Sequence, residues 1–180
     1  TDPPYGIEIV QGSSVGGGKI AKTTTYSPVV GDDSIDTAVK AYELCQSLKI
    51  EKLLFWGGNY YSSYLPNSSC WYVWDKDNTG NFADCELAWT NMNRSAKLYK
   101  QTWNGMIRQG ESGKRVHPTQ KPIALAVNAF EVFDAGHAIL DLFLGSGSTL
   151  IACEQTDRQC YGLELDPHYV DVICKRWQTL

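Results

Sequence analysis

The chain has 180 residues and a formal net charge of −4, with 43% hydrophobic and 20% charged residues. This composition is that of an ordinary globular protein and excludes a chain that is largely disordered. No apolar run approaches the length that crosses a bilayer, and the N-terminus has no signal-peptide pattern, so we expect a cytoplasmic protein without membrane association.

Six cysteines and three histidines are spread along the chain. None of the cysteines forms a Cys-x-x-Cys pair and no histidine has zinc-ligand spacing, so we expect no metal site. Cys45, Cys153 and Cys174 lie in apolar helical patterns, where small buried thiols are common. We expect all six thiols to be reduced, as in an intracellular protein, with a set of disulfides as the alternative.

The first predicted elements are a loop and a helix. Residues 11–33 are rich in Gly, Ser and Thr, which is typical of a mobile loop. Residues 34–48 then show helical spacing, with Ser34 as the expected N-cap. The apolar residues expected on one face of this helix are Ile35, Val39, Tyr42 and Cys45.

Short strands follow the first helix. Lys52–Trp56 is an apolar run closed by two glycines, which predicts a buried strand. Residues 71–74 and 85–90 predict two more strands, and the polar segment 75–81 between them predicts a hairpin-like connection. Residues 91–116 are polar, basic and irregular, so no regular element is expected there.

Strands and helices alternate in the last third of the chain. We expect a helix over 121–133 with Pro122 in its first turn, a buried parallel strand over 138–142, and a tight turn at 145–147. A helix from Thr149 and a strand over 159–163 come next. The last helix is expected to start at Asp166 as N-cap and Pro167 as N1, and its apolar face comprises Val170, Ile173, Cys174 and Trp177. This alternation predicts an α/β sheet that is mostly parallel.

The acidic chain has one basic segment, residues 94–121, in which Glu111 is the only acidic residue. A basic stripe on an acidic body can contact phosphates, although a solvated loop is the alternative. Its basic residues are Arg94, Lys97, Lys100, Arg108, Lys114, Arg115 and Lys121.

The segment 141–149, Asp-Leu-Phe-Leu-Gly-Ser-Gly-Ser-Thr, has the order strand, glycine turn, helix. Such a turn brings a ligand close to backbone N–H groups at a helix N-terminus. Glu164 follows Asp141 by about twenty residues. At this spacing an acidic residue of a Rossmann-type fold binds the ribose hydroxyls of the cofactor. The pattern is not Gly-x-Gly-x-x-Gly, which weakens a nicotinamide or flavin interpretation. An ordinary turn with a helix-capping acid is the alternative.

The N-terminal segment Asp2-Pro3-Pro4-Tyr5 forms a second constellation. Each proline fixes φ and biases the preceding residue towards an extended backbone, so the segment is a rigid ledge. The Asp2 carboxylate and the Pro3 carbonyl can each accept an N–H, and the Tyr5 ring can stack on a planar base. A plain proline-rich turn is the alternative.

Together these motifs resemble the S-adenosylmethionine-dependent DNA amino-methyltransferases, and most closely the adenine-N6 group of the β class, in which the catalytic motif precedes the cofactor motif. Three further segments carry the resemblance: His117-Pro-Thr-Gln-Lys-Pro122, the strand pair containing Trp74-Asp75-Lys76 and 82–89, and Gly162-Leu-Glu-Leu-Asp166. The match spans nearly the whole chain, in the order that this group has.

The resemblance implies a role for each matching residue. Asp2 and the Pro3 carbonyl would hold the target amino group, Pro4 would stiffen the ledge, and Tyr5 would stack on the flipped base. The cofactor-binding residues would be Thr119, Lys121, Asp141, Phe143, Gly145, Ser146, Gly147, Ser148, Thr149, Glu164 and Asp166. Among these, Thr119 and Lys121 would meet the carboxylate end of the cofactor, Glu164 its ribose, and Ser148 and Thr149 would cap the helix that faces it.

The resemblance therefore implies an enzyme that methylates N6 of adenine in double-stranded DNA after base flipping, without a metal, as a monomer or homodimer. Cytosine-N4 transfer is the first competing reaction, and it usually has Ser at the position of Asp2. An RNA or protein amide target, a non-catalytic cofactor- or DNA-binding relative, and a nicotinamide-dependent dehydrogenase are further candidates. Enzymes of restriction–modification, phage defence and gene regulation would all carry these motifs, so the biological role stays open.

The expected fold is a single Rossmann-like methyltransferase domain over 1–180, mostly parallel, with an antiparallel edge hairpin and helices on both faces. In the family a central strand precedes the ledge, whereas only Thr1 precedes it here, so we expect that strand to be lacking. Residues 91–116 would be a reduced target-recognition segment that contacts DNA through Arg94, Lys97, Lys100, Arg108, Lys114 and Arg115. The loop 11–33 would close over the base or serve as a linker.

Overall fold

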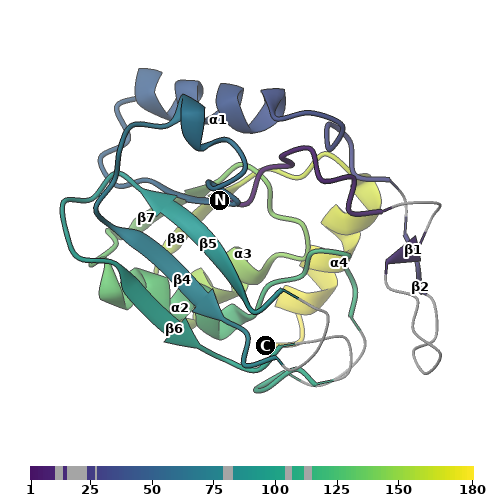
Figure 1. Ribbon diagram of the computed structural model, residues 1–180. Coiled ribbons are helices and arrows are strands. Elements are labelled where there is room, and N and C mark those ends of the chain that lie inside the picture. Colours follow the sequence, from purple (N-terminus) through teal and green to yellow (C-terminus); the bar gives the residue numbers. More distant parts are fainter. Residues whose placement is uncertain (11–13, 16–23, 27, 79–82, 104–106, 112–114) are drawn as a thin grey trace. The chain divides into compact units, whose positions relative to one another are not determined.

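The computed structural model describes residues 1–180 except 11–13, 16–23, 27, 79–82, 104–106 and 112–114 (Figure 1). The chain divides into two compact units. One of them, residues 3–109, is called the aromatic unit because it holds every tryptophan except Trp177. The other, residues 1–2 with 110–180, is called the glycine-turn unit because it contains the turn at 145–147.

The aromatic unit contains a four-stranded sheet with the order β3-β5-β4-β6. Its strands are β3 (Leu54–Trp56), β4 (Trp71–Asp75), β5 (Cys85–Thr90) and β6 (Lys97–Lys100). β5 is antiparallel to both β3 and β4, with Phe55 opposite Trp89 and Trp74 opposite Glu86. The predicted strands, and the antiparallel pairing of 71–74 with 85–90, are therefore confirmed.

β6 was not predicted, and the expectation of an irregular segment throughout 91–116 is wrong. This strand pairs parallel to β4, with Val73 opposite Leu98, and an isolated bridge joins Trp103 to Arg108 further along. The strand lies at the edge of the sheet and both its lysines are exposed. Edge strands commonly carry lysine and bury little apolar surface, so a hydrophobic pattern does not reveal them.

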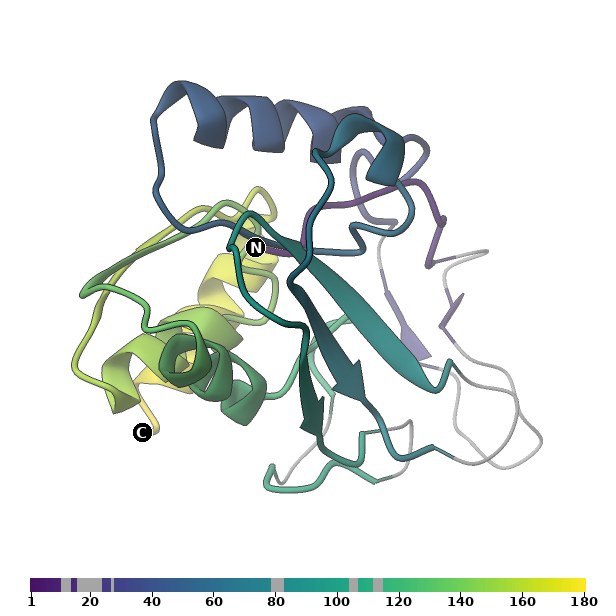
Figure 2. The same cartoon turned by 60° about the vertical axis from the view of Figure 1, so that its left-hand side comes forward.

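Helix α1 (Asp36–Ser47) lies at one end of the strands of the aromatic unit and contacts β3 and β5 (Figures 1 and 2). The Tyr42 ring packs edge-on against Phe55 of β3 and Trp89 of β5, with ring centroids 6.1 and 5.6 Å apart. Cys45 of the predicted face is buried, together with Ala38 and Ala41. Ile35 rather than Ser34 occupies the N-cap, but the Ser34 hydroxyl accepts the N–H of Asp36 at 3.3 Å.

The segment predicted as a loop over 11–33 contains two short strands, β1 (Ser14–Val15) and β2 (Thr24–Thr25), which pair antiparallel. Residues 16–23, the centre of that predicted loop, lie outside the described residues. A 3₁₀ turn, η1 (Ser62–Tyr64), follows β3.

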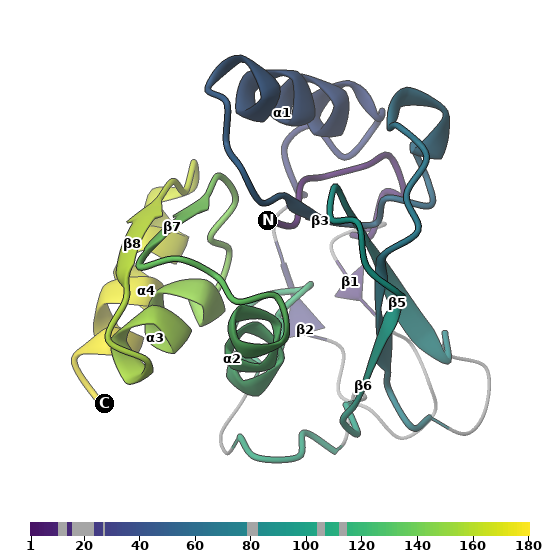
Figure 3. The same cartoon turned by 90° about the vertical axis from the view of Figure 1, so that its left-hand side faces the viewer.

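The glycine-turn unit contains two parallel strands, β7 (Ala138–Asp141) and β8 (Gln159–Gly162), connected through α3 (Ser148–Gln155). Its other helices are α2 (Ile123–Val132) and α4 (Pro167–Trp177) (Figure 3). Phe130 of α2 and Cys153 of α3 form a small core, against which Ile139 of β7 and Cys160 of β8 pack. The predicted strand–turn–helix–strand order is confirmed.

Three details of the glycine-turn unit differ from expectation. In β7 only Asp141 is buried, so this strand is not buried throughout its length. In α4 the buried residues are Tyr169 and Ile173, whereas Val170, Cys174 and Trp177 of the predicted face are exposed. The face is rotated because the Tyr169 ring packs on the His117 ring, a tertiary contact that helical periodicity does not contain. Cys174 is therefore not a buried thiol.

All six cysteines are free thiols, as predicted. In the part of the chain that is described, no helix is long and apolar enough to cross a membrane. Within the same part, no group of three or more His, Cys, Asp or Glu side chains is arranged to hold a metal ion.

Candidate active site

The turn between β7 and α3 depends on two glycines. Gly145 and Gly147 have φ angles of +52° and +80°, a region that residues with a Cβ rarely adopt. Gly147 is the N-cap of α3, and no side chain caps this helix, so neither Ser148 nor Thr149 takes the capping role expected of them. A Cβ on Gly147 would lie 3.0 Å from Ile173 of α4, so both the backbone angle and the close packing require glycine here.

Glu164 joins the end of β8 to this turn. Its Oε2 accepts the N–H of Gly145 at 2.7 Å, and its Oε1 accepts the N–H of Asp166 at 2.9 Å. Asp166 in turn caps α4 by accepting the N–H of His168 at 2.8 Å, as the sequence predicted. The Glu164 carboxylate is thus fixed beside the glycine turn, where the two parallel strands end.

Asp141, at the C-terminal end of β7, connects the turn to the N-terminus. Its side chain is only 5% exposed, and its Oδ1 accepts the Phe143 N–H at 3.2 Å. The same oxygen accepts the hydroxyl of Thr1 at 2.7 Å. Because Thr1 is covalently next to Asp2, this bond holds the start of the ledge at the end of β7.

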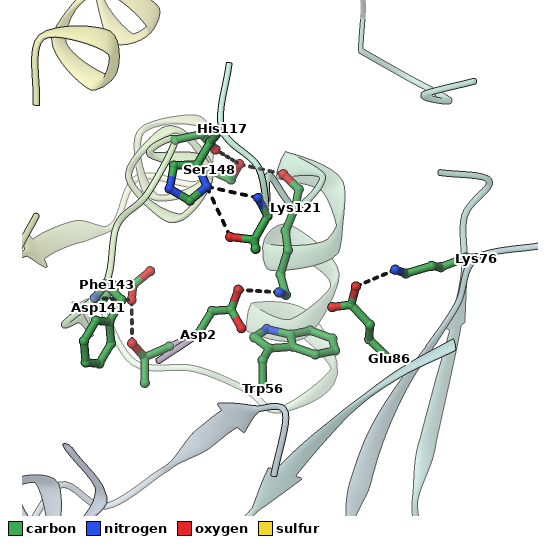
Figure 4. Close-up of polar contacts among 12 residues, drawn as sticks. Asp2, Trp56, Lys76, Glu86, His117, Lys121, Asp141, Phe143 and Ser148 are labelled. Carbon is green, nitrogen blue, oxygen red and sulfur yellow. Dashed lines mark hydrogen bonds and ion pairs between the residues drawn. The ribbon is translucent and has the colours of Figure 1, made fainter. Parts of the chain in front are cut away.

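A second contact brings the Asp2 side chain to the glycine-turn unit. Figure 4 shows Asp2 and Lys121 pointing towards one another, with 2.5 Å between Lys121 Nζ and Asp2 Oδ2. The Ser148 hydroxyl, in the first turn of α3, donates to the Lys121 carbonyl at 2.6 Å. Lys121 was expected to meet the carboxylate end of the cofactor; its ammonium is here in contact with the ledge aspartate.

His117 occupies the start of the segment 117–122. Its Nδ1 accepts the N–H of Thr119 at 3.2 Å, and the Thr119 hydroxyl lies 3.1 Å from the same nitrogen. Burial, with smaller effects of Arg115 and Lys121, lowers the pKa of His117 to about 4. The ring is therefore neutral at pH 7, and with Nδ1 as acceptor its proton resides on Nε2. Its Cε1 would lie 3.3 Å from a Cβ on Gly145, so it borders the turn.

Glu111 and Arg176 form hydrogen bonds with each other and with the backbone around the glycine turn. No role was predicted for either residue from the sequence. Glu111 Oε1 accepts the N–H of Ile123 at 2.7 Å, while Oε2 accepts from Gln120 at 3.2 Å and from Arg176 at 3.5 Å. Arg176 also donates to the Ser146 carbonyl. An acidic residue within an otherwise basic segment was the available signal for Glu111.

In the aromatic unit, the Tyr5 side chain packs against Tyr60 and lies close to Gly57. Its ring stacks on Tyr60, with centroids 4.9 Å apart and an interplanar angle of 17°. Gly57 has φ +68°, and a Cβ there would lie 2.3 Å from Tyr5 Cε1, so only glycine fits under this ring. Tyr60 is 56% exposed, which leaves its side chain room to move.

Asp32 holds the backbone that follows the ledge. Its side chain is 6% exposed. Oδ1 accepts from the N–H groups of Tyr5, Gly6 and Ile7 at 3.3, 3.1 and 3.3 Å, and Oδ2 accepts from Ile9 at 2.8 Å. Sequence reasoning missed Asp32 because it lies in a segment interpreted as a mobile loop.

The glycine-turn unit therefore contains Asp2 and all the predicted cofactor residues, whereas Pro3, Pro4 and Tyr5 belong to the aromatic unit.

The residues predicted to contact DNA are also divided between the two units. In the aromatic unit Arg94 and Lys97 are exposed, Lys100 pairs with Asp77 at 2.8 Å, and Arg108 lies 5.9 Å from the centroid of the Trp103 ring. Arg115, in the glycine-turn unit, donates to the His117 carbonyl at 2.9 Å, and Lys114 lies outside the described residues.

Comparison with known proteins identifies the family. The model of a family described as DNA methylase, of the N6/N4 methyltransferases, matches residues 71–175. The chain belongs to this DNA methylase family. The match includes the strand pair β4–β5, the segment 117–122 and the glycine turn, and the family's cofactor is S-adenosylmethionine, as the motifs predicted.

Two curated relatives and one solved structure are similar to parts of this chain. Type II methyltransferase M.Cfr9I of Citrobacter freundii is 49% identical over 43 residues, which is 24% of this chain and 14% of that protein. Type II methyltransferase M.SmaI of Serratia marcescens is 42% identical over 41 residues, which is 23% of this chain and 14% of that protein. The chain thus matches about a seventh of the length of these relatives.

The crystal structure of M1.HpyAVI covers 78% of this chain and 81% of its own chain, with 19% identity and a TM-score of 0.53. At this identity the likeness concerns the fold alone. It confirms the predicted fold class, an α/β methyltransferase fold with parallel and antiparallel strand pairs.

Proposed function

We propose that this DNA methylase transfers a methyl group from S-adenosylmethionine to N6 of adenine in double-stranded DNA. The observation that carries the proposal is the position of Asp2. The hydroxyl of Thr1 on Asp141 and the ammonium of Lys121 hold this residue within the unit that contains the glycine turn. A group that accepts hydrogen bonds from the target amine therefore lies in the same unit as the candidate cofactor site.

The residues at the glycine turn fit S-adenosylmethionine. Each Glu164 oxygen accepts one backbone N–H, and a carboxylate oxygen can accept two bonds, so the ribose hydroxyls still find acceptors there. Phe143, Gly145 and Gly147 would line the methionine side, and Thr119 would contact its carboxylate end. When bound, the cofactor supplies an electrophilic methyl group on a sulfonium sulfur.

The role of the ledge follows from the chemistry of the amine. The lone pair of an adenine amino nitrogen is delocalised into the ring, which makes the nitrogen a poor nucleophile. Hydrogen bonds to the Asp2 carboxylate and the Pro3 carbonyl favour the tetrahedral nitrogen that attacks. Once the nitrogen has gained its methyl group it is acidic, and Asp2 can take the proton that it loses. Tyr5 would stack on the base after it leaves the duplex.

Asp2 is also the reason to propose adenine rather than cytosine. The family includes both N6 and N4 methyltransferases, and the first residue of the ledge is usually Ser in the cytosine-N4 enzymes, whereas it is Asp here. Cytosine N4 is the second candidate target, because a ledge that binds one exocyclic amine has the hydrogen-bond acceptors for the other.

Contacts with the DNA backbone would come from the basic residues of 94–108. Arg94, Lys97 and Lys100 are exposed, and the guanidinium of Arg108 lies over the Trp103 ring. Exposed cations suit contact with the phosphates of DNA, so we propose that this segment binds the duplex.

The test is to identify the product. The chain is incubated with labelled S-adenosylmethionine and a duplex library of mixed sequence, and the digested nucleosides are separated by mass spectrometry. N6-methyladenine is the expected product, and a reaction containing S-adenosylhomocysteine is the control. N4-methylcytosine would replace the adenine proposal, and the absence of any methylated nucleoside would contradict the proposal as a whole.

A further inference from the structure

Lys121 and Asp2 form an ion pair with little access to water. The distance from Nζ to Oδ2 is 2.5 Å, and the two side chains are 14% and 20% exposed (Figure 4). Charge-assisted hydrogen bonds are about twice as strong as neutral ones, and removing one partner of a pair that is mostly out of water leaves the other poorly solvated. The pair therefore constrains the carboxylate more firmly than a surface contact would.

The backbone of Lys121 is itself fixed. Its carbonyl accepts the hydroxyl of Ser148, which is buried in the first turn of α3. The next residue, Pro122, is the N-cap of α2 and holds φ at −62°. The ammonium is therefore carried by a segment fixed at α3 and at the start of α2, so its position follows that of the glycine turn.

We propose that Lys121 is a positioning residue for Asp2, and that it does not hold the cofactor's carboxylate. By binding Oδ2, the ammonium sets the rotation of the carboxylate and with it the direction of the other oxygen, Oδ1. Through the bond from Ser148 to the Lys121 carbonyl, the same residue links that orientation to the α3 end of the glycine turn. The inference rests on the proposed methyl transfer.

The experiment separates cofactor binding from transfer. Lys121→Met removes the charge and keeps much of the length, Lys121→Arg keeps the charge, and Lys175→Met replaces an exposed lysine of the same unit as the matched control. For each variant, S-adenosylmethionine affinity is measured calorimetrically without DNA, and the rate of methyl transfer is measured in a single turnover with saturating cofactor. Circular dichroism verifies that each variant folds.

For Lys121→Met we expect a transfer rate about 10²-fold lower, since misplacing a reacting group has effects of this order, while cofactor affinity changes less than about threefold. Lys121→Arg should recover at least about a tenth of the wild-type rate, because the charge remains. If Lys121→Met does not fold, the inference is judged on Lys121→Arg, whose rate must fall while its cofactor affinity stays unchanged. A loss of cofactor affinity equal to the loss of rate, in either variant, would overturn the inference.

A double-mutant cycle with Asp2→Asn tests whether Lys121 acts through Asp2. If it does, Asp2→Asn/Lys121→Met transfers no more slowly than Asp2→Asn alone, within about threefold, because contacting residues are not additive. Losses that multiply would overturn the inference while leaving methyl transfer itself intact. A wild-type chain that transfers no methyl group would instead remove the proposed function, on which the inference depends.

Discussion

The two units of the chain hold their candidate functional groups through different kinds of contact. In the glycine-turn unit the contacts are polar: Glu164 binds the turn, Asp141 binds Thr1, and Lys121 binds Asp2. In the aromatic unit the Tyr5 ring lies close to Gly57 and stacks on the Tyr60 ring. The difference teaches that the residues of the ledge are held by two kinds of contact, Asp2 by an ion pair in the first unit and Tyr5 by an aromatic ring in the second. Two residues depart from this division, His117 in the glycine-turn unit and Asp32 in the aromatic unit, and we expect both to have large effects on stability.

His117 is the aromatic exception in the polar unit, and it should make stability depend on pH. Because its pKa falls from 6.5 to about 4 on folding, the unfolded chain binds a proton more readily in that window. The free energy of unfolding should therefore be highest above pH 6.5 and should fall by up to about 3 kcal/mol as the pH drops towards 4. Urea unfolding at several pH values measures it.

His117→Asn should abolish that pH dependence, whereas His137→Asn, at an exposed histidine, should leave it unchanged. An equal slope in wild type and His117→Asn between pH 4 and 6.5 would contradict this interpretation of the half-buried ring.

Asp32 is a polar residue of the aromatic unit whose carboxylate binds the backbone of residues 5–9. Asp32→Ala leaves four backbone N–H groups without their acceptor, so the free energy of unfolding should fall by about 2 to 3 kcal/mol. Denaturant unfolding measures the change. Asp33→Ala, at the exposed neighbouring residue, is the control and should be nearly neutral. Equal losses in both variants would show that the carboxylate of Asp32 has no special role in holding the ledge.

Glu164 is the carboxylate of the glycine-turn unit that binds the turn. Glu164→Ala should weaken S-adenosylmethionine binding by about thirtyfold, since hydrogen bonds to a charged group contribute about 1.5 to 3 kcal/mol. Calorimetric titration measures the affinity, and Glu131→Ala on the exposed side of α2 is the control. Binding of a flipped base, followed by 2-aminopurine fluorescence, should change little. A variant with wild-type cofactor affinity would refute the assignment of Glu164.

Tyr60 is the residue of the aromatic unit that stacks on Tyr5. Of the substitutions proposed here, its replacement should have the smallest effect. A base that stacks on the Tyr5 face now covered by Tyr60 must displace that ring, and an aromatic pair contributes about 0.5 to 1.5 kcal/mol. Tyr60→Ala should therefore strengthen the 2-aminopurine signal of the flipped base by a few-fold. Tyr64→Ala, at another exposed tyrosine, is the control. A weaker signal would mean that Tyr60 supports the base and does not occupy its place.

Sequence motifs predicted the glycine-turn unit better than the aromatic unit. The turn, the Asp166 cap and the position of Glu164 depend on glycine angles and local hydrogen bonds, which a sequence encodes over a few residues. Contacts between distant segments were not predictable in this way. The buried face of α4 depends on Tyr169 meeting His117, about fifty residues earlier in the chain.

The aromatic unit shows the same limit. β6 is a short edge strand with exposed lysines and no apolar pattern, and Asp32 reaches the ledge from a segment that composition describes only as loop. The ion pair of Lys121 with Asp2 joins residues far apart in the sequence. Its members were both predicted as site residues, but their contact with each other was not.

The role of Asp2 is tested most directly by measuring methyl transfer and cofactor binding on the same preparations of wild type and Asp2→Ala. We expect N6-methyladenine from the wild type, a transfer rate at least about 10²-fold lower in Asp2→Ala, and equal S-adenosylmethionine affinity in both. Full transfer by Asp2→Ala would contradict the central claim that this carboxylate, held beside the glycine turn, binds the target amine.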